Sequence, residues 1–129
     1  VFGVLVLATA LARAGLTTEL ARLYAETPAP LATIGGVAAG GSALINNHPM
    51  ALLHSIALAG APDSHVLAAL VGGDLGPRLL PIGSLAGLLW MHALRRQGVH
   101  VPLGTFVRVG VLVTIPSLIV SLGVLWLFA

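Results

Sequence analysis

The sequence has no cysteine, no lysine and few charged residues of either sign. The absence of cysteine excludes disulfide bonds, thiolate metal sites and cysteine nucleophiles in this chain. Charged residues occupy 8% of the positions, whereas they make up about 25% of an average soluble domain. The arginines form no basic cluster interleaved with aromatic residues, so no nucleic-acid partner is predicted.

Apolar residues are abundant and lie in long runs. They occupy 57% of the positions, and the mean hydropathy is +1.03. No Asp, Glu, Lys or Arg occurs at 27–62, 79–94 or 109–129, and such stretches suit a hydrocarbon core about 30 Å thick. The sequence therefore predicts an all-α membrane protein. Because the chain begins at Val1 in an apolar stretch without a methionine, a basic n-region or a cleavage site, we expect a fragment that starts within a membrane span.

Prolines, glycines and polar turns divide the chain into predicted segments. These are the end of a transmembrane helix (1–14), an interfacial amphipathic helix and linker (15–28), a re-entrant helical hairpin with the tip NNHP (29–61), a discontinuous transmembrane helix (64–97, broken at 76–81) and a C-terminal transmembrane helix (103–129). Each hairpin arm of about 13 residues reaches only about 20 Å, too little to span the core alone. One kinked span of about 30 residues is the alternative for this region.

The distribution of arginine predicts how these segments are oriented. Arg95, Arg96 and Arg108 lie in or near the loop before the last span, whereas the turn at 61–65 has no arginine. By the positive-inside rule, residues 95–105 then lie in the cytoplasm and residues 61–65 outside.

The predicted hairpin tip breaks a helix inside the bilayer. Such a break exposes N–H groups at one new helix end and carbonyl groups at the other, which is tolerated only inside protein or beside a wet cavity. We expect Asn47 to cap the second arm, with Pro49 in its first turn, where a missing N–H costs nothing. Asn46 then has a free carboxamide to offer a polar solute.

The segment GGDLGPRLLPIGS breaks the next span. Gly76 and Pro77 are expected to stop the first half-helix and Pro81 to begin the second, with the Ser84 hydroxyl in its first turn. The positive end of the helix dipole formed there favours an anion or a hydroxyl oxygen. A hairpin tip that faces a broken span is typical of the central site of an inverted-repeat secondary transporter, of which this chain would form the second half.

Titratable side chains near these breaks have more than one possible role. Asp74, the one carboxylate well inside an apolar run, can exchange protons with a transport pathway or pair with Arg78, and the two roles are not exclusive. His48 at the hairpin tip can titrate, although a histidine beside a helix break is more often a cap or a hydrogen-bond partner. We expect His54 to be a neutral donor that faces the protein interior. No carboxylate or cysteine lies in a position to complete a metal site with the histidines, so none is predicted.

Three stretches of the sequence resemble a known family. In order along the chain they are NNHPMALL, GGDLGPRLLPIGSLAGLLWMHALRRQG and FVRVGVLVTIPSLIVSLGVLWL. Together they resemble the C-terminal part of the ArsB-type arsenite efflux permeases, members of the ion transporter superfamily. The resemblance implies a multi-pass transporter of the bacterial inner membrane, not an enzyme, that exports arsenite and antimonite. It implies exchange for protons or association with an ATPase subunit, no cofactor, and an N-terminal half of the same transporter that completes the site.

The resemblance also assigns roles to residues at both breaks. The positions that match the family motifs and are predicted to bind substrate are Asn46, Asn47, Pro49, Gly76, Pro77, Gly83 and Ser84. Asp74 and His48 are the candidates for proton coupling, and His48 stands where the family motif has an apolar residue. Neutral arsenous acid suits amide and hydroxyl groups, and a site without thiolates can release the soft arsenic in each cycle.

Other functions fit parts of the same pattern. A related transporter could carry sodium or a carboxylate anion on the same fold. A passive metalloid channel is a second alternative, because an asparagine followed closely by a proline at a re-entrant tip also occurs in aquaglyceroporins. A membrane subunit that transports nothing is a third.

Overall fold

The structure, a computed structural model, describes residues 2–129, so that Val1 of the predicted segment 1–14 lies outside the described residues. The elements are α1 (Phe2–Arg13), α2 (Leu16–Glu26), α3 (Pro30–Ile45), α4 (Asn47–Ala57), α5 (Asp63–Leu75), the 3-10 turns η1 (Gly76–Arg78) and η2 (Pro81–Gly83), α6 (Leu85–Arg96) and α7 (Leu103–Phe128). Because residues 2–129 include no strand, the predicted all-α class is confirmed.

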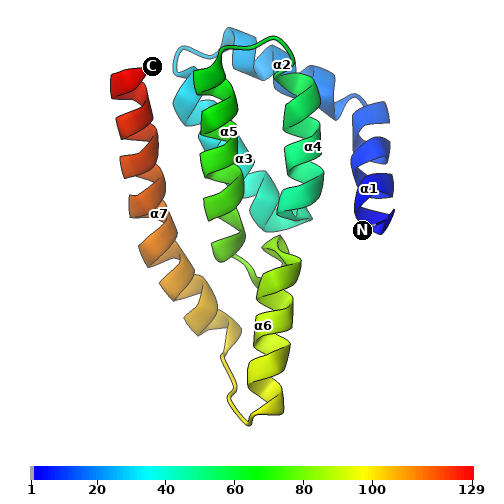
Figure 1. Cartoon of the computed structure of the whole chain (residues 1–129), viewed down its shortest axis with the longest axis vertical. Coiled ribbons are helices and arrows are strands. Elements are labelled where there is room, and N and C mark those ends of the chain that lie inside the picture. The colour runs from blue at the N-terminus through cyan, green and yellow to red at the C-terminus, as the bar shows by residue number, and fades with distance from the viewer. Residues whose placement is uncertain (1) are drawn as a thin grey trace.

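Two interruptions of the helices lie at the middle of the molecule: the turn between α3 and α4, and the segment between α5 and α6 (Figure 1). Helices α3 and α4 form a hairpin whose open end lies beside α2 and whose turn lies near the junction between α5 and α6. The α4–α5 loop and the C-terminus lie at one end, and the loop between α6 and α7 lies at the other. These two ends correspond to the two sides of the membrane in the predicted orientation, which stays a prediction.

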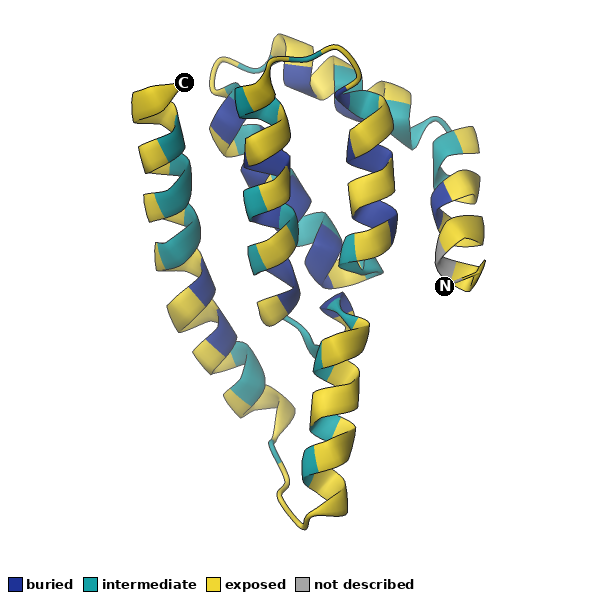
Figure 2. Cartoon of the chain, in the orientation of Figure 1, coloured by how far each residue is buried: buried dark blue, intermediate teal, exposed yellow. Residues whose placement is uncertain are grey.

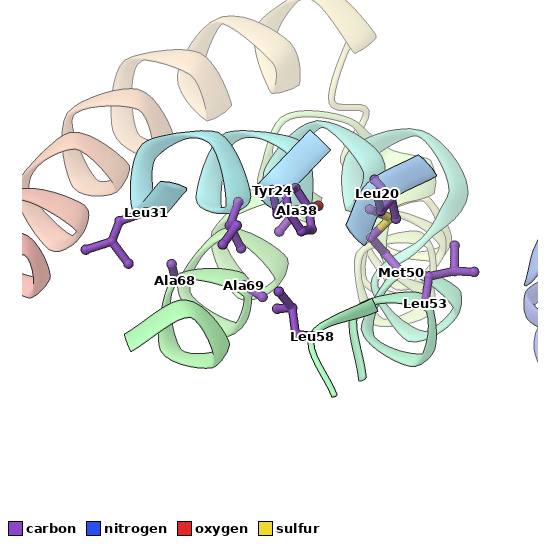
Figure 3. Packing of buried hydrophobic residues seen from close by; sticks show 10 residues of the cluster. Leu20, Tyr24, Leu31, Ala38, Met50, Leu53, Leu58, Ala68 and Ala69 are labelled. Atoms are coloured by element: carbon purple, nitrogen blue, oxygen red, sulfur yellow. The ribbon is translucent and has the colours of Figure 1, made fainter. Parts of the chain in front are cut away.

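The core of the described chain is formed by α2, α3, α4 and α5. Ile34 and Leu53 are completely buried, and the side chains of Tyr24, Met50 and Ala68 belong to the same cluster (Figure 3). Helix α3 begins with Pro30 at its first turn, where proline has no N–H to lose and its φ suits the helix. The cluster fastens α2, the predicted interfacial helix, to both arms of the hairpin.

Small residues bring α3 into main-chain contact with α5 and with η1, which follows it. A Cβ added at Gly72 would overlap the carbonyl oxygen of Gly35, and a Cβ added at Gly76 would overlap that of Ala39. Close approach of this kind replaces side-chain burial as the source of packing between helices in lipid. Of the other glycines in the first hairpin arm, Gly35 and Gly41 face neighbouring side chains, whereas Gly36 and Gly40 face open space.

More residues are exposed in α6 and α7, which lie outside this core (Figure 2). Helix α6 buries none of its residues, and α7 buries only Gly110 and Thr114. Among the described residues, α7 is the one helix long and apolar enough to cross a membrane by itself, with a length of about 39 Å. The exposed apolar side chains of α7, such as Leu112 and Ile119, form a surface suited to lipid or to further protein.

Candidate substrate site at the two interruptions

Asn46 forms the turn between α3 and α4. It has φ 81° and ψ 148° and is, among residues 2–129, the one non-glycine residue with a positive φ. Its Oδ1 accepts a hydrogen bond from the main-chain N–H of His48 at 3.3 Å, which makes Asn46 the N-cap of α4. The predicted role of Asn47 as the cap is therefore wrong. Two adjacent asparagines are equally good caps by residue type, and the choice depends on which one leaves the helical φ and ψ values.

The hairpin tip contacts the interruption between α5 and α6. Nδ2 of Asn46 donates to the carbonyl oxygen of Ile82 at 3.4 Å, a long hydrogen bond that links positions 36 residues apart. A Cβ added at Gly83 would lie 2.6 Å from Cα of Pro77 and 3.2 Å from Cα of Ala43, so there is room only for glycine. The predicted site residues Asn46 and Gly83 thus hold the two interruptions together.

The interruption itself consists of two 3-10 turns. Helix α5 ends at Leu75, and the main-chain N–H of Leu79 bonds to the carbonyl of Gly76 at 2.9 Å. Pro81, predicted to begin the second half-helix, begins η2 instead. Ser84, predicted to lie in the first turn of that half-helix, is the N-cap of α6, where its Oγ accepts from the N–H of Gly87 at 3.0 Å. The cap uses one lone pair of Ser84 and leaves its O–H group free to donate.

Asp74 does not pair with Arg78. Nη1 of Arg78 donates to the main-chain carbonyl of Asp74 at 2.9 Å, not to its carboxylate. Within residues 2–129 the one salt bridge joins Arg22 and Glu26 on the exposed face of α2. Of the two roles open to Asp74 in the sequence, this geometry removes the ion pair. Arg78 satisfies a carbonyl near the end of α5, where a helix has no N–H of its own to do so.

His48 is held by the asparagines beside it. Its Nδ1 lies 2.9 Å from Oδ1 of Asn47 and 3.4 Å from Oδ1 of Asn46. Because a carboxamide oxygen only accepts, Nδ1 of His48 must be the donor in both contacts. Its Nε2 takes part in neither contact and stays available to a solute.

A cleft of about 500 Å³ lies between α4 and α5, next to the hairpin tip. The predicted site residues that line it are Asn47, His48 and Asp74. The others, Asn46, Pro49, Gly76, Pro77, Gly83 and Ser84, are not among its lining residues. Pro49, Gly76, Pro77 and Gly83 are buried in packing. The predicted site residues therefore fall into two groups. Some, such as Asn46 and Gly83, connect the two interruptions, and others, Asn47, His48 and Asp74, line the cleft beside them.

Two features of this region were missed in the sequence. The first is a buried pair, in which the Tyr24 hydroxyl lies 2.8 Å from Nε2 of His54 with the two rings stacked at 5.8 Å. Nδ1 of His54 lies 2.9 Å from the carbonyl of Met50 and must donate to it, so Nε2 of a neutral ring accepts the tyrosine proton. His54, which we expected to be a neutral donor facing the interior, thus links α2 to α4 through its hydrogen bond with Tyr24. The second feature is Ser42, a buried serine that also lines the cleft.

Two substitutions of Asn46 distinguish the stability that its side chain adds as a helix cap from the cost of its backbone conformation. Its φ and ψ lie near a region adopted almost only by glycine, where other residues pay about 1–3 kcal/mol. Asn46→Ala keeps that strain and loses the cap, so we expect it to destabilise the protein by about 1–2 kcal/mol. Asn46→Gly relieves the strain and loses only a few tenths of a kcal/mol of capping. Thermal melting of the purified variants should show alanine melting lower than both glycine and wild type; equal melting of alanine and glycine would contradict this.

Comparison with known proteins supplies the family. The ArsB family profile, described as arsenical pump membrane protein, matches residues 1–129. The arsenical pump membrane protein of Escherichia coli strain K12 is 36% identical over 126 residues, which cover 89% of this chain and 29% of that protein. That of Yersinia enterocolitica is 38% identical over 90 residues, which cover 65% and 21%.

An uncharacterized transporter of Mycobacterium tuberculosis is 31% identical over 139 residues, which cover 97% of this chain and 32% of that protein. No solved structure matches the chain. The chain spans about a third or less of the length of the curated relatives it matches. Since the family profile covers all of its residues, the chain belongs to the ArsB family of arsenical pump membrane proteins, which are membrane transporters.

Proposed function

We propose that this chain acts as the C-terminal part of a secondary transporter that exports arsenite and antimonite from the cytoplasm in exchange for protons. Its place is a bacterial inner membrane, which it crosses more than once. Helices α3 and α4 form a re-entrant hairpin, because α3, the longer arm with 16 residues, is about 24 Å long and the hydrocarbon core is about 30 Å thick. Helices α5 and α6 form one discontinuous transmembrane helix, since each alone is shorter still.

The observation that carries this proposal is the contact between the two interruptions. Asn46 reaches the carbonyl of Ile82, and the cleft beside that contact is lined by Asn47, His48 and Asp74. Helix ends broken within lipid need polar partners or a wet cavity, and the Asn46–Ile82 contact and the adjacent cleft support such an arrangement here. Amide, imidazole and carboxylate groups together offer donors and acceptors to the three hydroxyl groups of neutral arsenous acid. An N-terminal half of the same transporter would supply groups from the opposite side.

Asp74 is the group we assign to proton coupling. Its carboxylate lines the cleft, and the neighbouring guanidinium of Arg78 is engaged with a main-chain carbonyl. A carboxylate without a cation partner can bind and release a proton as the solute leaves and enters. His48, whose Nε2 is available, is a second carrier on the same cleft. The proton gradient then provides the energy, with an ATPase subunit as an additional partner in some hosts.

Vesicle transport tests the coupling. Everted membrane vesicles that contain the permease should accumulate radiolabelled arsenite against its concentration gradient only while a proton gradient is present. Uptake that persists after the proton gradient is collapsed would contradict proton exchange, and equilibration without accumulation would indicate a passive channel. Competition by excess sodium or by a carboxylate anion would instead favour the alternative cargoes.

A further inference from the structure

The hydroxyl group of Ser42 is buried without a hydrogen-bond partner. Ser42, on α3, is 0% exposed, and its Oγ is one of two buried side-chain polar atoms without a partner among the described residues. Native proteins leave few such atoms, because an unpaired buried hydroxyl loses its bonds to water and gains none in return. Packing does not call for the hydroxyl, since the α3 residues around it that face the core are the alanines Ala38, Ala39 and Ala43.

Ser42 lies on the wall of the cleft between α4 and α5. Gly73 of α5 also lines this cleft, and a Cβ added at Gly73 would lie 3.8 Å from Oγ of Ser42. That distance is an ordinary contact, so an alanine would fit at position 73. Because glycine has no Cβ, residue 73 places no side-chain atom against Oγ of Ser42.

Most other polar groups of the cleft already have partners. Both ring nitrogens of His54 are engaged, with Met50 and with Tyr24, and the hydroxyl of Ser55 donates to the carbonyl of Leu52 at 2.8 Å. Ser42 therefore differs from these neighbours, because it retains both a donor and an acceptor. Asp74 adds an acceptor to the same cleft.

We propose that Oγ of Ser42 binds the transported solute, and that this solute is a small, uncharged, hydroxylated molecule such as arsenous acid. A neutral hydroxyl group satisfies both the donor and the acceptor of a serine, whereas a bare cation would leave the donor unpaired. The assignment rests on the proposed function and adds to it a residue of α3 outside both motifs.

Ser42→Ala separates a ligand role from a structural role. The variant removes an unpaired buried atom and creates no clash, so its melting temperature should equal or exceed that of the wild type. Its apparent KM for radiolabelled arsenite in everted vesicles should rise about three- to tenfold, the value of one neutral hydrogen bond. Gly73→Ala, which covers the hydroxyl, should raise KM in the same direction while the protein stays folded.

Thr114→Val is the matched control. Thr114, on α7, is the other buried hydroxyl without a partner, and it does not line this cleft. We expect its KM to equal that of the wild type. If the wild type shows proton-driven uptake and Ser42→Ala has an unchanged KM, the assignment of Ser42 is overturned and the proposed function stands. If the purified wild-type permease neither binds nor takes up arsenite, both are overturned.

Discussion

Gly72→Ala is expected to lower the melting temperature of the permease. The new methyl group would overlap the carbonyl oxygen of Gly35 and lie 2.9 Å from Cβ of Ala38. Neither neighbour is a flexible side chain, so α3 and α5 must separate, and overpacking of this kind costs about 1–3 kcal/mol. Alanine also has a higher helix propensity than glycine, which stabilises the helix by about 1 kcal/mol. Because overpacking costs up to about 3 kcal/mol, we expect a net loss of stability.

The control for this variant is Gly123→Ala on α7. A Cβ at Gly123 would meet no atom within 4 Å, so only the propensity gain remains and the melting temperature should stay the same or rise. Thermal melting of both purified variants, followed by fluorescence-detected gel filtration, gives the comparison. A Gly72→Ala variant as stable as Gly123→Ala would show that α3 and α5 do not make main-chain contact.

Asp74→Asn is expected to reduce proton-driven arsenite uptake strongly. Asparagine keeps the size and the hydrogen-bonding ability of the side chain but cannot bind or release a proton in the cellular pH range. Uptake into everted vesicles under a proton gradient should fall at least about tenfold. Melting temperature should change little, because Arg78 bonds to the main chain of residue 74 and not to the carboxylate.

Asp63→Asn provides the matched substitution on the same helix. Asp63 lies in the first turn of α5, at the opposite end of the helix from Asp74, and it does not line the cleft; its charge there interacts with the helix dipole. Its loss should cost about 0.3–1 kcal/mol of stability and leave uptake unchanged. Equal uptake by Asp74→Asn and wild type would remove Asp74 from the coupling step. A large loss of stability in Asp74→Asn would indicate a structural carboxylate instead.

The sequence predicted the helical class well, because composition and the spacing of helix breakers are local properties. Pro30, Pro49 and Pro81 each stand at the start of a helical segment, where the residue type alone gives the reason. The glycine contacts were harder to predict. Gly72 and Gly40 look alike in a row of small residues, and only the path of the partner helix decides that one contacts main chain and the other open space.

The candidate site shows the same limit more sharply. Residue type marked both interruptions, but it could not tell which asparagine takes a positive φ, nor that Arg78 turns to a carbonyl. Ser42 carries no signal in sequence, since a serine among alanines and glycines reads as helix packing. Its unpaired hydroxyl becomes visible only when α5 is placed against α3. Long-range geometry therefore supplied what local pattern did not.

The location of bound arsenic is the most direct measurement. Crystals of the permease soaked with arsenite, with diffraction data collected at the arsenic absorption edge, would give the position of the arsenic atom without assumption about its ligands. We predict an anomalous peak in the cleft between α4 and α5, within hydrogen-bonding reach of Ser42, Asn47 and Asp74 through its hydroxyl groups. An arsenic peak outside this cleft would contradict the proposal. So would a structure in which packed side chains fill the cleft, or in which 46–49 and 76–84 form continuous helix.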